Sequence, residues 1–131
     1  MPKRRLVILC VDDEQSGLTL RTLMLEYKGY RVLAATTAEQ ALELFSSHHV
    51  DLVLADQLLS NSTSGTVLAS AMRRRKAGIP IVIYSGVAKL PADLDEQDFF
   101  ISKLDTPEEL FAAIERIISA KVISTDMLKA A

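Results

Sequence analysis

Five short apolar runs recur along the chain, and longer segments with a helical spacing of apolar residues separate them. Alternation of this kind is typical of parallel strands joined by crossover helices. The central runs are apolar at consecutive positions, which indicates that helices cover both faces of the sheet. We therefore predict an α/β fold with a doubly wound sheet of five parallel strands. The expected strands are Leu6 to Val11, Arg31 to Ala35, Leu52 to Ala55, Ile81 to Tyr84 and Phe99 to Ile101.

The segments between these runs carry apolar residues at the spacing of one helix face. Thr37 precedes Gln40 by three positions and Thr106 precedes Glu109 by three, so each pair predicts a capping box at a helix start. The residues expected to face the core are, on the first helix, Leu20, Leu23, Met24 and Tyr27; on the second, Ala38, Ala41, Leu42 and Phe45; on the third, Leu68, Ala71 and Met72; and on the last, Leu110, Ala113, Ile114 and Ile117.

The stretch from Gly86 to Asp98 does not follow this pattern. It contains Pro91, four acidic residues and too few periodic apolar residues for a regular helix. We expect a single helical turn or a loop here, and hence a shortened or irregular fourth helix. Residues 1–120 should form one domain, while residues 121–131 extend the last helix or fray as a tail.

Composition narrows the functional classes. The 131 residues, of which 49% are hydrophobic, suffice for one domain with a sizeable core, and we expect no second output domain. The net charge of −2 argues against direct nucleic-acid binding, and no apolar run is long enough for a membrane span. Cys10 is the only cysteine, so no intrachain disulfide can form, and we expect a cytoplasmic protein.

Polar residues stand at the points where the predicted strands end. Asp12 and Asp13 follow the first strand, Asp56 follows the third, Ser85 follows the fourth, and Lys103 stands at the end of the fifth. Ligands of open parallel sheets bind outside the carboxyl ends of the strands. We therefore expect these five side chains to converge on one edge of the sheet.

Three carboxylates placed together repel one another unless a cation lies between them. Mg²⁺ suits such a site, because it prefers hard oxygen ligands and commonly keeps several waters. We expect Asp13 and Asp56 to bind Mg²⁺ directly and Asp12 to hold a metal-bound water. The backbone carbonyl of Leu58 could add a further oxygen ligand.

Asp56 is also a candidate nucleophile, since a carboxylate can attack phosphorus and form an aspartyl phosphate. The transition state of this reaction spreads negative charge over three phosphoryl oxygens. We expect Mg²⁺, the Lys103 ammonium and the Ser85 hydroxyl to meet these oxygens. Gly86, beside Ser85, leaves room for the phosphoryl group.

Four segments carry a family resemblance: VDDE at 11–14, DLVLAD at 51–56, IVIYSG at 81–86 and FFISK at 99–103. With these segments in this order, the chain resembles the receiver domain of two-component response regulators, in its single-domain, CheY-like form. The resemblance implies a flavodoxin-like (βα)₅ fold and phosphotransfer to Asp56 from a histidine kinase or a phosphotransfer protein. It also implies a switch in which Ser85 moves toward the phosphoryl group and Phe100 turns inward.

The same resemblance implies a signalling domain rather than an enzyme. Self-phosphorylation from small donors and slow self-dephosphorylation would be its only reactions. The signal would leave through a surface contact with a downstream protein that the sequence does not identify.

Three features depart from the family pattern. Leu104 replaces the proline that usually follows the lysine, so we expect a trans peptide bond there. Ser60 replaces another proline, and the polar loop Asn61 to Ser64 that follows should be more mobile than usual. Ser85 and Lys103 lie closer in sequence than in other members, which would alter the surface used for partner docking.

Three other classes of protein compete with this interpretation. A degenerate receiver would bind partners without being phosphorylated. A flavin-binding electron carrier of this fold would need a loop rich in Ser, Thr and Gly where Asp12 and Asp13 stand. A phosphatase of the aspartyl-phosphate class would need a second aspartate where Leu58 stands. His48 and His49 are adjacent, which is typical of a solvated helix end and not of a metal pair.

Overall fold

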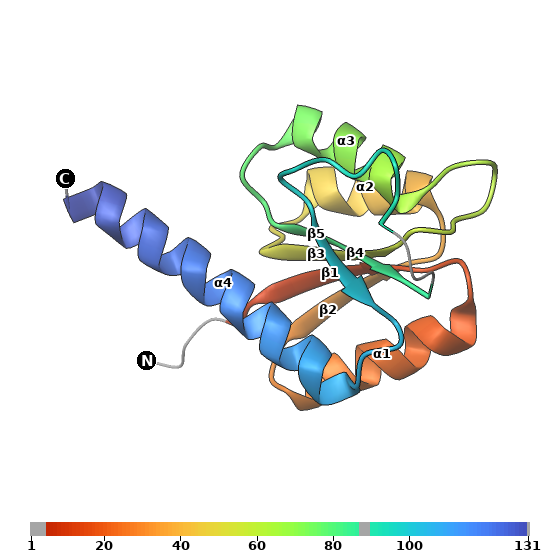
Figure 1. Ribbon diagram of the computed structural model, residues 1–131, viewed down its shortest axis with the longest axis horizontal. Helices are drawn as coiled ribbons and strands as arrows, with labels where there is room; N and C mark the ends of the chain where they lie inside the picture. Colours follow the sequence, from red (N-terminus) through yellow and green to blue (C-terminus); the bar gives the residue numbers. More distant parts are fainter. Residues whose placement is uncertain (1–4, 87–89, 131) are drawn as a thin grey trace.

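Five parallel strands form a single sheet in the computed structural model, which describes residues 5–86 and 90–130 (Figure 1). The strand order is β2-β1-β3-β4-β5, and this confirms the predicted doubly wound sheet. The strands are β1 (Val7–Val11), β2 (Arg31–Ala35), β3 (Leu52–Asp56), β4 (Ile81–Ser85) and β5 (Phe99–Ser102). The described residues form the helices α1 (Gln15–Tyr27), α2 (Ala38–Ser47), α3 (Gly65–Arg75) and α4 (Pro107–Ala130).

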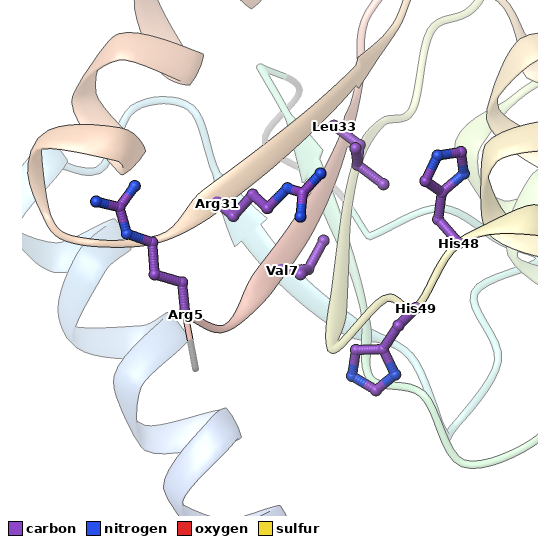
Figure 2. Close-up of a pocket in the computed structure, with 6 residues that line it drawn as sticks. All are labelled: Arg5, Val7, Arg31, Leu33, His48 and His49. Carbon is purple, nitrogen blue, oxygen red and sulfur yellow. The ribbon is translucent and has the colours of Figure 1, made fainter. Parts of the chain in front are cut away.

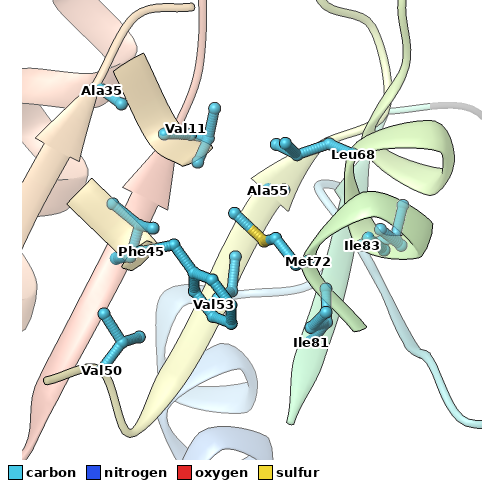
Figure 3. Packing of buried hydrophobic residues seen from close by; sticks show 13 residues of the cluster. Val11, Ala35, Phe45, Val50, Val53, Ala55, Leu68, Met72, Ile81 and Ile83 are labelled. Atoms are coloured by element: carbon cyan, nitrogen blue, oxygen red, sulfur yellow. The ribbon is translucent and has the colours of Figure 1, made fainter. Parts of the chain in front are cut away.

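Two hydrophobic clusters lie on the two faces of the sheet, since successive strand residues point to opposite faces. The helices α2 and α3 cover one face, and α1 and α4 cover the other (Figure 1). Phe45 and Met72 pack on the first face, among the side chains drawn in Figure 3. The second cluster contains Ile8, Cys10, Leu18, Leu25, Leu52, Leu54, Val82, Leu110 and Ile114. Both faces are therefore apolar, as the consecutive apolar residues of the central strands predict.

The threonine half of each predicted capping box is present, while the Gln40 side chain accepts from the Thr36 backbone N–H at 3.0 Å and not from Thr37. The Thr37 hydroxyl accepts a hydrogen bond from the Gln40 backbone N–H at 3.1 Å, and the Thr106 hydroxyl accepts one from Glu109 at 3.2 Å. The α4 helix continues to Ala130, beyond the domain end expected at residue 120, and the division of the chain at that point stays a prediction. No helix within the described ranges is both long and apolar enough to cross a membrane.

The face of α1 that meets the sheet differs from the prediction. Leu18 and Leu25 are buried, whereas Leu20, Leu23 and Tyr27 are 61%, 60% and 89% exposed. The sequence of α1 holds two apolar stripes on different faces, and periodicity alone does not say which one meets the sheet. Packing of α1 against β1 and β2, in the cluster that also holds Leu110 and Ile114 of α4, selects the stripe of Leu18 and Leu25.

The segment between β4 and β5 forms turns and no helix over its described residues 90–98, which agrees with the loop alternative for this stretch. Residues 87–89 of the predicted segment lie outside the described residues. Arg73 of α3 contacts two acids of this segment. It donates to Asp98 and lies 3.7 Å from the Asp95 carboxylate. Thr66 donates to the Asp93 carboxylate at 2.8 Å, and Leu94 packs against the hydrophobic cluster under α2 and α3. Polar contacts to α3 therefore hold this loop in place of a regular helix.

Asp98 is the most buried acid of this loop. Its side chain is only 1% exposed, and its Oδ2 atom has no hydrogen-bond partner within the described part of the chain. Burial raises the pKa of Asp98, although the attraction of Arg73 opposes this rise. Ionised Asp98 thus costs folding free energy, and Arg73 limits that cost.

Gly65 begins α3 directly against the backbone of Asp56. A Cβ atom at this position would lie 2.5 Å from the Asp56 carbonyl oxygen and 3.2 Å from the Gln57 Cα. The Gly65 N–H donates to the Gln57 carbonyl at 3.0 Å. Only glycine therefore allows the start of α3 to approach the end of β3 this closely.

Replacing Arg73 by methionine should lower the free energy of unfolding by about 2 kcal/mol near neutral pH, because buried Asp98 would lose its counter-charge. Removal of Arg73 raises the pKa of Asp98 further, so the loss should shrink as the pH falls toward the ordinary value of 3.8. Urea unfolding of both proteins across this pH range measures the difference. Arg74→Met, on an exposed neighbour, is the control and should stay within about 0.5 kcal/mol of the parent. Equal losses in both variants would contradict the account.

Gly65→Ala should lower the free energy of unfolding by about 1 to 3 kcal/mol, because its methyl group would overlap the Asp56 carbonyl. Gly86→Ala is the matched control, since a Cβ there would meet only the Lys103 side chain, at 3.9 Å. Denaturant unfolding measures the free energy of unfolding of the two variants. A Gly65→Ala protein as stable as Gly86→Ala would show that the contact is not restrictive.

Candidate functional site

Asp12, Asp13 and Asp56 lie together at the carboxyl ends of β1 and β3. Each offers one carboxylate oxygen, and these three oxygens lie within 4.8 Å of one another. Asp12 and Asp56 are buried, whereas Asp13 is exposed. Val11 pairs with Ala55 in the parallel ladder, so the register of β1 and β3 sets Asp12 beside Asp56. The acidic part of the predicted site is thus assembled by the sheet.

The strands β3 and β4 each extend one residue beyond their predicted ends. Asp56 and Ser85 are consequently the last residues of β3 and β4 and belong to the ladder themselves. Ser85 is 1% exposed and stands in register with Ser102 of β5. Backbone hydrogen bonds of the buried strands therefore fix the Cα positions of Asp56 and Ser85.

Lys103 reaches into the acidic cluster from the end of β5. Its Nζ atom lies 2.8 Å from Asp56 Oδ2 and 3.7 Å from Asp12 Oδ2. The Lys103 backbone N–H donates to the Ser85 carbonyl at 2.8 Å, which anchors the start of the loop. The described residues contain no cis peptide bond, so the bond before exposed Leu104 is trans, as expected. Lys103 therefore reaches Asp56 without a proline after it.

Phe100 and Leu58 take positions that leave their predicted roles untested. Phe100 is half-buried and packs against the cluster under α2 and α3, while Phe99 is 43% exposed. Leu58 exposes its side chain, and its backbone N–H donates to Asp56 Oδ1 at 3.3 Å. The switch role of Phe100 and the metal-ligand role of the Leu58 carbonyl stay predictions.

Two further side chains bind the acidic cluster, and the sequence pattern predicts neither contact. Arg21 Nη2 donates to Asp12 Oδ2 at 3.0 Å. Ser60 Oγ donates to Asp13 Oδ2 at 2.9 Å, from a loop in which Asn61 and Ser62 have φ angles of 63° and 59°. Ser60 stood out in the sequence only as a replaced proline. Arg21 gave no signal, because a single arginine inside a helix is ordinary.

A separate hollow of about 450 Å³ lies near the starts of β1 and β2, at the opposite end of these strands from the acidic cluster (Figure 2). His48 and His49 are both exposed there, as expected for a solvated helix end. The His49 ring lies 2.8 Å from an Asp51 carboxylate oxygen. The lining residues are Arg5, Val7, Arg31, Leu33, His48 and His49. None of them belongs to the acidic cluster, so the hollow is a different place on the molecule.

Comparisons with known proteins agree with this geometry. Among curated proteins, the chain is 30% identical over 122 residues to the alkaline phosphatase synthesis transcriptional regulatory protein PhoP of Bacillus subtilis. It is 26% identical over 116 residues to the response regulator SaeR of Staphylococcus aureus. These matches cover 89% and 86% of the chain but 50% of each relative, so the chain spans about half the length of these proteins.

Solved structures give the same result. A CheY-like response regulator receiver domain protein from Methanospirillum hungatei matches 92% of the chain and 99% of its own, with a TM-score of 0.81 and 25% identity. A response regulator receiver protein from Sinorhizobium medicae matches 90% and 98%, with a TM-score of 0.82 and 26% identity. The family model of the response regulator receiver domain matches residues 8–115. The chain therefore belongs to the receiver domain family of two-component response regulators.

Proposed function

We propose that this receiver domain is a phosphorylation-dependent switch in which Asp56 accepts a phosphoryl group from a histidine kinase or a phosphotransfer protein. The observation that carries the proposal is the contact between Lys103 Nζ and Asp56 Oδ2, inside a cluster of three carboxylates. A lysine in this position meets the charge that develops on a phosphoryl group attached to Asp56. The relatives support this partner class. SaeR is named a response regulator, and a relative from Vibrio cholerae that is 36% identical over 81 residues is named a sensor kinase/phosphatase.

The residues present fit a Mg²⁺ ion. Three carboxylate oxygens within 4.8 Å of one another are hard ligands, and exposed Asp13 leaves the cluster open to solvent. We expect Asp13 and Asp56 to be direct ligands, with Asp12 acting through a bound water and Leu58 through its backbone carbonyl. When bound, Mg²⁺ supplies positive charge to the phosphoryl oxygens.

The chain's own groups would act in sequence. A carboxylate oxygen of Asp56 attacks the phosphorus atom, the new P–O bond forms, and the P–N bond of the donor phosphohistidine breaks. The imidazole keeps the electron pair of the P–N bond and leaves as a neutral ring, because its other ring nitrogen carries a proton. Lys103 already contacts Asp56 and would move its ammonium to a phosphoryl oxygen, where the Ser85 hydroxyl would donate a hydrogen bond to another.

The low exposure of Asp56 favours slow turnover of the product. Asp56 is 8% exposed, and Leu58, two residues later, has no group that could act as an acid or base. A rapid phosphatase would need such a group to activate water. We therefore expect slow self-dephosphorylation and no further enzymatic activity.

A phosphorylation-independent interaction module is the alternative. The absence of a helix over the described residues 90–98 favours the interaction module. This segment departs from the (βα)₅ pattern at a surface that a partner protein would contact. In such a module the acidic cluster would persist without accepting phosphate. Phosphorylation of the purified protein separates the two functions.

Incubation with acetyl phosphate and Mg²⁺ should add one phosphoryl group, about 80 Da by intact-mass spectrometry, to the wild-type chain. The Asp56→Asn protein should gain none, because an amide cannot serve as the nucleophile. Asp105→Asn, on an exposed aspartate outside the acidic cluster, should retain the full gain. A wild-type chain that stays unmodified would favour the interaction module, and a gain that survives Asp56→Asn would refute the assigned acceptor.

A further inference from the structure

Arg21 brings a positive charge into the acidic site from the middle of α1. Its side chain is 12% exposed, and its Nη2 atom lies 3.0 Å from Asp12 Oδ2. Lys103 Nζ lies 3.7 Å from the same oxygen. One oxygen of a buried aspartate thus faces two cations, which come from different elements of the fold.

Gly17 leaves space for the Arg21 side chain, and the Tyr84 ring lies next to its guanidinium group. A Cβ atom on Gly17, one helical turn earlier, would lie 3.5 Å from Arg21 Nη2 and 3.2 Å from Glu14 Oε2. The guanidinium carbon lies 4.9 Å from the centre of the Tyr84 ring, and Lys103 Nζ lies 5.7 Å from the same centre. Cations over an aromatic face are attracted to it. Tyr84 therefore supports both cations next to the carboxylates.

Asp12 does not depend on Arg21 alone for its orientation. Its Oδ1 atom accepts a hydrogen bond from the Glu14 backbone N–H at 2.9 Å. Its Oδ2 atom retains Lys103 as a neighbour if Arg21 is removed. The main consequence of removing Arg21 is therefore the loss of a positive charge and of a competitor for Asp12 Oδ2.

We propose that Arg21 is a positioning residue that sets the affinity of the acidic site for divalent cations. It occupies an Asp12 oxygen that a metal or its bound water would otherwise use, and its charge repels the incoming cation. Arg21 and Lys103 together leave the three carboxylates with one uncompensated negative charge. The pocket is thereby held together without metal, at the expense of weaker metal binding. This inference rests on the proposed Mg²⁺ site.

Replacing Arg21 by methionine keeps the aliphatic stem and removes the charge. The dissociation constant for Mg²⁺ should fall about threefold to tenfold, because the site gains a negative charge and a free oxygen. Isothermal titration with MgCl₂ at low ionic strength measures this constant. Arg21→Lys should restore a value within about twofold of wild type, since it retains the charge.

Arg74→Met is the matched control, because it removes the same charge from an exposed position on α3. Its dissociation constant should stay at the wild-type value. Thermal unfolding gives an independent readout: without metal Arg21→Met should melt below wild type, and Mg²⁺ should raise its melting temperature by more. Arg21→Gln serves the same measurements if the methionine variant does not fold.

The outcomes separate this inference from the proposed function. If wild type binds Mg²⁺ and the uncharged Arg21 variant binds it with equal or lower affinity, the role of Arg21 is refuted and the phosphorylation site stands. If wild type binds no Mg²⁺, both the role of Arg21 and the proposed metal site fall. If Arg74→Met also binds Mg²⁺ more tightly than wild type, the change in net charge explains the effect, and a role specific to Arg21 is refuted.

Discussion

Repulsion among three carboxylates at one edge of the sheet is the constraint on which the rest of the site depends. The ladder between β1 and β3 leads Asp12 and Asp56 to the same place. The Asp12 backbone N–H donates to the Ala35 carbonyl and Asp56 pairs with Tyr84, so strand pairing fixes the backbone of both residues. Nearby cations offset the repulsion between the carboxylates. They are Lys103, which follows β5, and Arg21 on α1. Residues far apart in the sequence are thus gathered by one electrostatic requirement.

Much of the fold and the acidic cluster could be predicted from the sequence, because strand runs and their polar ends are local features. The rotation of α1 could not, since Leu18 with Leu25 and Leu20 with Leu23 offer two apolar faces, and only packing chooses between them. The contact of Arg21 with Asp12 could not be predicted either, for a related reason. Its role depends on a contact between a helix and a strand end that no spacing rule connects.

The departures from the family pattern follow β3, β4 and β5, which are neighbouring strands of the sheet. Ser60 binds Asp13 directly in place of a proline, and Lys103 reaches Asp56 although Leu104 follows it. The described residues 90–98 form a loop that contacts Arg73, and the sequence does not predict a regular helix there. The acidic cluster and its contact with Lys103 are therefore present together with these changes in the surrounding loops.

Chemical mapping of the phosphorylated residue tests the central claim most directly. Borohydride reduces an aspartyl phosphate to homoserine, so treatment of the acetyl-phosphate-labelled chain marks the acceptor permanently. Tandem mass spectrometry of the digested protein then locates the mark. The account predicts homoserine at position 56, where β3 ends between the metal-ligand candidates and Lys103. A mark at Asp12 or Asp13, or at no aspartate, would contradict it.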